Sequence, residues 1–387
     1  MLIGFLLILA AAVGCGSDRP PGTVICHYNQ QDSIYVGSPS LCILPDGTYI
    51  ASHDEFGPGS SSTTAAVTRI YRSEDRGEHW RPVTRLDGQF WSNLFVHRGI
   101  LFLMGTDKEH GNLIIRRSED RGNTWSSPID SITGLLRTGE YHTAPMPVIS
   151  YRGRIWRAVE CARSNTDIWG KRYSAMIISA PDSADLLQAA SWSVTDSLPY
   201  DSTYLDGKFG AWLEGNAVVT PDGNVADLLR VDYALGPEYA ALIRLRIRYH
   251  STCSTLKKIS SGCREEPKVY SAVRLLSGRY WSLVNYVTQE WAGKQNPAWV
   301  RNTLALSSSP NLQEWTVHRT VLHHPDIAKH GFQYADWLFD GNDIVLLSRT
   351  AYDDNGTGAH NCHDANYMTF HRIKDFRKAL TEQAGNR

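Results

Sequence analysis

Several ionisable side chains in this sequence have types and spacings that could perform acid–base chemistry. His53 carries an imidazole, which can act as both acid and base near neutral pH because its unperturbed pKa is about 6.5. Glu214 precedes Arg230 by about the length of one hairpin, and Tyr141 precedes Arg157 by a similar length. A carboxylate can activate a hydroxyl group, and arginines bind carboxylates in a bidentate manner. These residue types favour acid–base chemistry on a carboxylated ligand.

A repeated motif in the sequence indicates the strands and turns that would position these groups. "SEDRGEHW" at 73–80 returns as "SEDRGNTW" at 118–125, so that both copies read S-x-D-x-G-x-x-W. Asp can bond nearby backbone N–H groups, Gly supplies a positive φ, and Trp can anchor the turn on apolar neighbours. These segments resemble the Asp boxes of sialidase-like β-propellers, and "SSSPNLQEW" at 307–315 resembles a degenerate third copy. The resemblance implies structural turns distant from the active site.

Six strand–turn–strand units follow one another along the chain, each with short alternating strands around a Gly-containing turn. They begin at "SPSLCIL", "WSNLFVH", "TAPMPVI", "EGNAVVT", "YSAVRLL" and "QYADWLF". Their spacing of about 40 to 70 residues is typical of propeller blades. We therefore predict an all-β fold, a single propeller of six four-stranded blades, with a seventh blade within 190–265 as the alternative.

The predicted organisation has four parts. They are a lipoprotein signal peptide at 1–15, a tether and ring-closing strand at 16–35, the propeller at 36–376 and a C-terminal tail at 377–387.

In such blades, the start of the first strand and the end of the second lie on one face, where propellers commonly bind ligands. We expect an active site there. The side chains predicted to face it are His53, Asp54, Asp107, His110, Tyr141, His142, Arg157, Glu160, Glu214, Asn216, Arg230, Asp232, Asn285, Arg301, Tyr334, Asp336 and Arg349.

Four of these positions match sialidase segments. "LEGNAVVTPDGNVADLLR" resembles the segment with a Glu followed by an inward Arg, which maps to Glu214 and Arg230. "RNTLALSSSPNLQEW" similarly places Arg301, and "QYADWLFDGNDIVLL" places Tyr334 as the nucleophile. The resemblance implies that Glu214 would take the proton of Tyr334, which is otherwise a weak nucleophile.

Two positions depart from the sialidase pattern. Gly37 in "GSPSL" stands where the family has an arginine, and the loop "FGPGSSSTT" lacks the expected acid/base Asp. The sequence therefore favours a changed chemistry on a retained scaffold, with the sialidase using Tyr334 and Glu214 as the alternative.

The segments "ASHDEFGPGS", "MGTDKEHGNLIIRRS" and "GEYHTAPMPV" resemble propeller enzymes of gut bacteria that release α-L-rhamnose from glucuronic acid. In that family one histidine is the principal catalyst, in hydrolysis or β-elimination. The resemblance implies His53 or His110 as the base and Tyr141 as the acid or a second base.

Binding residues complete this prediction. We expect a carboxylate clamp and further substrate contacts from Arg157, Arg230, Arg301, Arg349, Asn216 and Asp54. Hydrolysis by two carboxylates would instead use Glu214 with Glu160 or Asp54. The preferred substrate is a rhamnose–glucuronate linkage in complex plant glycans, and a surface glycan-binding propeller without catalysis remains a separate alternative.

Composition and the N-terminus set the context. The formal net charge is −1, so no basic footprint for nucleic acid is present. The apolar run before "AVGC" predicts an export signal with Cys15 as the lipidated residue, and hence a protein anchored to the bacterial outer membrane on its periplasmic or surface face. Acidic glycan side chains are the expected partners.

The remaining cysteines could form disulfides, and the histidine-rich loops could hold a metal ion. Cys253 and Cys263 could close a disulfide, or these thiols are free. His360, His363 and Asp364 have a spacing compatible with a metal site or the substrate rim, with a polar loop as the default. His323, His324 and His330 are expected in a surface loop. The predicted reaction requires no cofactor, and a structural or site divalent cation is left open.

Overall fold

The computed structural model describes residues 19–162, 166–232, 239–248, 251–254 and 273–378. Cys15 and Cys263 lie outside these residues, as does most of the predicted tail. Cys26, Cys42, Cys161 and Cys362 form no disulfide among the described residues. Among the described residues, no helix has the length and apolar character of a membrane span.

Six antiparallel sheets make up the fold, and we number them as blades in chain order. Blade 1 contains β2 (Tyr35–Val36), β3 (Ser40–Ile43), β4 (Tyr49–Phe56), β5 (Val67–Ser73) and β6 (Arg81–Asp87). Blade 2 contains β7 (Phe90–His97), β8 (Ile100–Thr106), β9 (Leu113–Ser118) and β10 (Leu135–Arg137). Blade 3 contains β11 (Tyr141–His142), β12 (Ile149–Tyr151), β13 (Arg154–Ala162), β14 (Tyr173–Pro181) and β15 (Ser193–Val194).

The second half repeats the pattern. Blade 4 contains β16 (Ala211–Val219), β17 (Val225–Asp232), β18 (Tyr239–Arg248) and β19 (Ser251–Ser254). Blade 5 contains β20 (Arg274–Leu276), β21 (Arg279–Asn285), β22 (Thr303–Ser309) and β23 (Thr316–His323). Blade 6 contains β24 (Gly331–Asp340), β25 (Asp343–Ala351), β26 (Tyr367–Ile373) and β1 (Thr23–His27). The helices are short: α1 (Ser62–Ala65), η1 (Gln30–Asp32), η2 (Ala189–Ser191), η3 (Tyr204–Gly207) and η4 (Pro297–Trp299).

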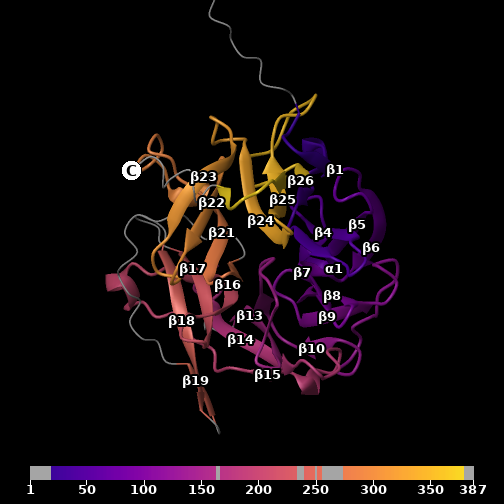
Figure 1. Cartoon of the computed structure of the whole chain (residues 1–387), viewed down its shortest axis with the longest axis vertical. Coiled ribbons are helices and arrows are strands. Elements are labelled where there is room, and N and C mark those ends of the chain that lie inside the picture. The colour runs from indigo at the N-terminus through magenta and orange to yellow at the C-terminus, as the bar shows by residue number, and fades with distance from the viewer. Residues whose placement is uncertain (1–18, 163–165, 233–238, 249–250, 255–272, 379–387) are drawn as a thin grey trace, which may run out of the picture.

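The blades follow one another around a ring, from indigo at the N-terminus to yellow at the C-terminus (Figure 1). The ring closes where β1 pairs antiparallel with β26, with Thr23 opposite Phe370. The described residues between 190 and 254 belong to blades 3 and 4, so the six-bladed prediction is confirmed for the described chain.

Apolar side chains of adjacent blades pack against each other to form the core. One cluster joins blades 2 and 3 and includes Met104 and Val159, and another joins blades 5 and 6 and includes Trp281 and Trp337. These are the inward-facing positions of alternating strands, so the hydrophobic pattern holds the blades together.

The Asp boxes are turns between the third and fourth strands of a blade. After β5, Asp75 Oδ1 accepts from the Ser73 hydroxyl at 2.8 Å and from the His79 amide at 2.9 Å. Trp80 Nε1 donates to the Gly77 carbonyl at 3.1 Å. The second box repeats these contacts, and in the third Asn311 takes the place of the Asp. Each box is therefore a closed hydrogen-bonded turn.

Candidate active site

A cavity of about 460 Å³ lies where all six blades contribute side chains. Its lining residues are Gly37, Ser38, Asp54 and Phe56 of blade 1; Phe90, Trp91 and Glu109 of blade 2; His142, Thr143, Ala144 and Trp169 of blade 3; Glu214, Arg230 and Asp232 of blade 4; Asn296, Ala298, Trp299 and Arg301 of blade 5; and Tyr334, Arg349 and His363 of blade 6. Because β4 ends at the cavity with Phe56 and β5 returns to Ser73, the first Asp box lies at the opposite end of its blade.

Three of these side chains reach the cavity from the same backbone feature, a left-handed residue at a β-bulge. Trp91, Glu214 and Tyr334 have φ values of 45°, 59° and 50°, in the left-handed region. Each lies where the register of an innermost strand shifts, in β7, β16 and β24 respectively. A β-bulge re-aims a side chain and is common beside active sites. Left-handed backbone at a non-glycine residue costs free energy, so it points to a functional position.

Two of these residues form a pair across the ring. The Tyr334 hydroxyl donates to Glu214 Oε1 at 2.8 Å, and Arg230 Nη1 lies 3.5 Å from the same oxygen. Glu214 Oε2 is buried without a hydrogen-bond partner among the described residues. Burial and the neighbouring Glu214 raise the pKa of Tyr334 above its usual value, although three guanidinium groups oppose the shift. The phenol of Tyr334 is therefore neutral at rest. It donates a hydrogen bond to the Glu214 carboxylate, which can accept the phenol proton during a reaction.

Three arginines from three blades surround this pair. Arg230 comes from β17, Arg301 precedes β22 and Arg349 belongs to β25. The guanidinium carbons of Arg301 and Arg349 lie 5.7 and 5.1 Å from the centre of the Tyr334 ring. Arg349 also lies 4.4 Å from the centre of the Phe56 ring. The cavity thus concentrates positive charge around the phenol.

Backbone and amide acceptors fix the latter two arginines. Arg301 Nε donates to the Ala298 carbonyl at 2.9 Å, and its Nη1 donates to the Gln333 side chain. Arg349 Nε donates to the His363 carbonyl at 3.1 Å. These acceptors hold both guanidinium groups at the cavity, and guanidinium groups are suited to binding an anionic ligand.

Asp54 supplies a second carboxyl group to the cavity. It is 1 % exposed, and in the described part of the chain neither carboxyl oxygen has a hydrogen-bond partner of normal geometry. Burial raises its pKa from 3.8 to about 7, against the amides of Ser38 and Trp91 and the charge of Arg349. A carboxyl with this pKa is partly protonated near neutral pH, which suits a general acid.

The Gly37 position is closed to any side chain. A Cβ there would lie 2.6 Å from both the carbonyl oxygen and Oδ2 of Asp54. An arginine at 37 is therefore incompatible with Asp54 as it is placed, and Arg349 brings a guanidinium to the same cavity from the neighbouring blade.

A histidine–carboxylate pair forms the wall at blade 3. His142 Nδ1 lies 2.7 Å from Glu160 Oε2, and the His142 ring stacks on Tyr173 with centroids 4.6 Å apart. Glu160 Oε1 accepts from the Gly215 amide at 2.7 Å, inside the bulge that presents Glu214. Glu160 therefore orients His142 and also supports the bulge in the next blade.

His53 requires a correction. The residue is fully buried and does not line the cavity; its Nε2 lies 3.2 Å from Tyr71 Oη and 3.3 Å from Cys26 Sγ. Burial lowers its pKa to about 4. Successive residues of a strand face opposite ways, so Asp54 points to the cavity while His53 points into its blade.

His110, the other candidate base, is half-buried and lies outside the cavity lining. Its Nε2 is 2.5 Å from Tyr173 Oη, and burial together with His142 lowers its pKa to about 4. His110 therefore packs behind the stacked Tyr173–His142 pair.

Three further predicted residues have structural surroundings. Tyr141 is buried, and its hydroxyl accepts from Arg137 Nε at 3.1 Å. Arg157 is buried with Nη2 donating to the Thr143 hydroxyl at 2.7 Å and to the Ala144 carbonyl at 2.8 Å, so it organises the 143–146 loop and does not clamp a carboxylate. Asn216 is 1 % exposed and is not part of the cavity lining. Tyr141 therefore lies outside the position predicted for an acid or base, and Arg157 and Asn216 lie outside the predicted carboxylate clamp.

Aromatic residues at the rim were not selected from the sequence. Trp169 and Trp299 line the cavity while remaining 56 % and 52 % exposed, from blades 3 and 5 respectively. His363 also lines it, with Nδ1 2.7 Å from Asp364 Oδ1, as in the rim alternative for that loop. Only a general richness in tryptophan signalled these rings in the sequence.

No protein-family model matches the chain, and no curated protein matches its sequence. Solved structures match its fold. An α-L-arabinanase of Penicillium chrysogenum complexed with arabinobiose is 16% identical over 92% of this chain and 98% of that chain, with a TM-score of 0.52. An α-L-arabinofuranosidase of Fusarium graminearum complexed with an iminosugar inhibitor is 12% identical over 93% and 97%, with a TM-score of 0.57.

Sialidases match as well. A Hadza microbial sialidase is 15% identical over 91% of this chain and 68% of that chain, with a TM-score of 0.58. A Trypanosoma rangeli sialidase in complex with sialic acid is 12% identical over 91% and 56%, with a TM-score of 0.53. The chain thus has the six-bladed propeller fold of these structures, and the sialidase-like fold prediction is confirmed.

Proposed function

We propose that this protein is an exo-acting glycoside hydrolase that removes a terminal acidic sugar, with sialic acids and related 2-keto sugar acids as the substrate class. The observation that carries the proposal is the 2.8 Å hydrogen bond from Tyr334 to Glu214 within a cavity lined by three arginines. Glycoside hydrolases and sialidases share the fold, which supports the class of reaction.

The arginines account for an acidic substrate. Arg230, Arg301 and Arg349 place three positive charges around one phenol, and guanidinium groups are suited to bidentate carboxylate binding. A sugar carboxylate bound there would hold the anomeric centre near Tyr334. A neutral phenol is the better nucleophile in this setting, because an anionic carboxylate would repel the substrate's own charge.

The reaction has two balanced steps. In the first, Glu214 accepts the phenol proton, Tyr334 Oη bonds to the anomeric carbon, and Asp54 donates its proton to the leaving oxygen. In the second, Asp54 takes a proton from water, the water oxygen bonds to the anomeric carbon, and Tyr334 departs and recovers its proton from Glu214. Two displacements at one carbon retain its configuration.

The rim suits a sugar as leaving group. Trp169 and Trp299 expose aromatic faces on separate blades above the cavity. Sugar rings have apolar faces that pack on exposed aromatic rings, so an oligosaccharide substrate is favoured over an isolated monosaccharide.

Rhamnose–glucuronate cleavage is the second candidate, and the His142–Glu160 pair favours it. His142 lies in the cavity with a carboxylate 2.7 Å behind it, the arrangement of a histidine base. In β-elimination His142 would remove the C5 proton beside the uronate carboxylate, which the arginines neutralise. A C4–C5 double bond would form as the C4–O bond breaks, and the Asp54 carboxyl would donate a proton to the leaving oxygen of rhamnose. This assignment moves the histidine chemistry from His53 to His142.

One set of incubations separates the functions. Purified protein is incubated with sialyllactose and, separately, with a rhamnose-capped arabinogalactan. We expect release of sialic acid and no release of rhamnose. Rhamnose release with the ultraviolet absorbance of an unsaturated uronate would favour elimination, and binding to either glycan without product would favour a non-catalytic glycan-binding protein.

We also infer export and lipid anchoring at Cys15, on the basis of the "AVGC" segment that ends the apolar run. Metabolic labelling with a radioactive fatty acid in a bacterial host tests this. We expect label on the wild-type protein in the membrane fraction and none on Cys15→Ser. Equal labelling of both would contradict the assignment.

A further inference from the structure

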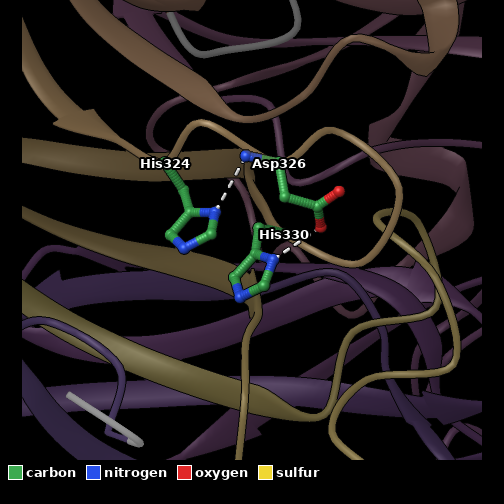
Figure 2. Close-up of side chains that lie close together, drawn as sticks. All are labelled: His324, Asp326 and His330. Atoms are coloured by element: carbon green, nitrogen blue, oxygen red, sulfur yellow. Dashed lines mark hydrogen bonds and ion pairs between the residues drawn. The ribbon is translucent and has the colours of Figure 1, made fainter. Parts of the chain in front are cut away.

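Two histidines and an aspartate gather between β23 and β24, outside the cavity (Figure 2). The rings of His324 and His330 stack with centroids 3.5 Å apart and an interplanar angle of 14°. His330 is only 5 % exposed, so this histidine departs from the surface position expected from the sequence, whereas His323 is exposed. Two imidazole rings in face-to-face contact cannot both be protonated without strong repulsion between their positive charges.

The Nδ1 atoms of both rings face Asp326 (Figure 2). His330 Nδ1 lies 2.7 Å from Asp326 Oδ2. His324 Nδ1 accepts from the Asp326 amide at 3.1 Å, so this nitrogen carries a lone pair. The three residues each offer a ligand atom, and these atoms lie within 4.8 Å of one another.

A second carboxylate lies behind the cluster. Asp353 Oδ2 is 3.3 Å from His330 Nε2, and that nitrogen is buried without a hydrogen bond of normal geometry among the described residues. Histidines that bind metals commonly donate their other ring N–H to a carboxylate, which leaves the first nitrogen as the ligand atom. Asp353 is placed to do this for His330.

We propose that His324, Asp326 and His330 form a binding site for one divalent transition-metal ion of the zinc class. Two imidazole nitrogens and one carboxylate oxygen suit zinc, nickel or copper, whereas calcium and magnesium prefer oxygen ligands alone.

A metal ion bound at this site would stabilise the backbone beside the cavity. The His324 amide donates to the Asn302 carbonyl at 3.0 Å, and the Phe332 amide donates to the Arg301 carbonyl at 2.8 Å. The Cys362 amide donates to the Ala328 carbonyl at 2.7 Å, next to His363. An ion bound between β23 and β24 would therefore stabilise the backbone that positions Arg301 and the loop that carries His363.

Calorimetric titration of chelator-treated protein with zinc tests the site. We expect one zinc ion per chain and a rise in melting temperature on binding. His324→Gln and His330→Gln should each lose this binding, and Asp353→Asn should weaken it about 10- to 100-fold. The controls are His323→Gln, next to the cluster, and His79→Gln, in the exposed Asp75–Glu78–His79 group; both should bind zinc as the wild type does.

An absence of stoichiometric zinc binding to the wild type would overturn the proposal, as would unchanged affinity in both cluster variants. X-ray absorption at the zinc edge of the wild-type protein gives a readout that needs no variant to fold. Scattering from two imidazoles is expected, and a spectrum without imidazole scattering would also overturn it. None of these results depends on the glycosidase activity.

Discussion

At the scale of single residues, the catalytic proposal depends on the difference between two carboxyl groups. Glu214 is close to Arg230 and accepts the phenol proton of Tyr334, which suits a base. Asp54 is buried at the cavity wall, and burial raises its pKa to about 7, which suits an acid. Opposite environments for two carboxyl groups in one cavity are the usual basis for separate acid and base roles.

Tyr334→Phe should reduce kcat for sialyllactose hydrolysis by about 10³-fold or more, because the variant lacks the nucleophilic oxygen and leaves only electrostatic stabilisation. The KM should change little, since the arginines remain. Tyr141→Phe is the matched control and should keep wild-type activity, because Tyr141 lies outside the cavity lining. Equal loss in the two variants would count against the assignment.

Asp54 predicts a pH dependence with a defined sign. The reaction needs its protonated form, so kcat/KM should fall as pH rises through about 7. Because the folded-state pKa lies above the usual 3.8, Asp54 favours folding at low pH, and this contribution is lost as pH rises from about 4 to 7. At pH 8 the free energy of unfolding of Asp54→Asn should therefore exceed that of the wild type by up to about 4 kcal/mol. The variant should unfold at a higher denaturant concentration and should lose activity. A variant no more stable than wild type at pH 8 would contradict the raised pKa.

At the scale of elements, bulges and interrupted strands decide which side chains reach the cavity. The innermost strands of blades 2, 4 and 6 each present one residue through a bulge, and the Glu160 carboxylate holds the Gly215 amide of one of them. In blade 1 the innermost strand is broken at Gly37, whose amide donates to the Asp54 carbonyl at 2.6 Å. The backbone between β2 and β3 thus approaches the acid closely enough to exclude a side chain.

Gly37→Ala should destabilise the protein by about 1–3 kcal/mol and lower kcat, because the added methyl group would overlap Asp54. Gly356→Ala serves as the comparison, since its nearest neighbour is the Asp354 carboxylate at 3.3 Å in an exposed loop. Denaturant melts and initial rates of both variants check this. A stable, fully active Gly37→Ala protein would show that the close approach is unimportant.

The same elements explain what the sequence could and could not predict. Asp-box turns and hairpin spacing predicted the six blades because they are local patterns. The match to sialidase segments placed Glu214, Arg230, Arg301 and Tyr334 in one cavity, as observed. His53 and Asp54 are neighbours in β4 and face opposite ways, so a misplacement of the strand by one residue exchanges the side chain that faces the cavity. Arg349, which the strand positions of blade 6 predicted to face the site, also lines the cavity.

At the scale of the whole molecule, the residues that stabilise the blade turns lie apart from the residues that line the cavity. Among the described strands, the first and the last along the chain, β1 and β26, pair in blade 6 and close the ring of blades (Figure 1). All six blades contribute side chains to the cavity. In blade 1 the cavity and the Asp box lie at opposite ends of β5. Changes at the Asp-box end should therefore affect folding without affecting the reaction.

Trp125→Ala tests this separation in the second Asp box. Trp125 is half-buried, donates to the Gly122 carbonyl at 3.0 Å and packs on the core shared by blades 1 and 2. We expect a loss of about 2–4 kcal/mol in the free energy of unfolding, with kcat unchanged below the melting temperature. A large loss of kcat in the folded variant would show that the two ends are coupled.

The nucleophilic role of Tyr334 is tested most directly by trapping the glycosyl-enzyme. An activated sialic acid analogue that carries fluorine beside its anomeric carbon slows breakdown of the covalent intermediate, and the protein is then analysed by intact mass and peptide mapping. The predicted result is the addition of one sugar unit to the peptide that contains Tyr334, and no addition to Tyr334→Phe. Turnover of the analogue without an adduct, or an adduct on Asp54 or Glu214, would contradict the proposed mechanism.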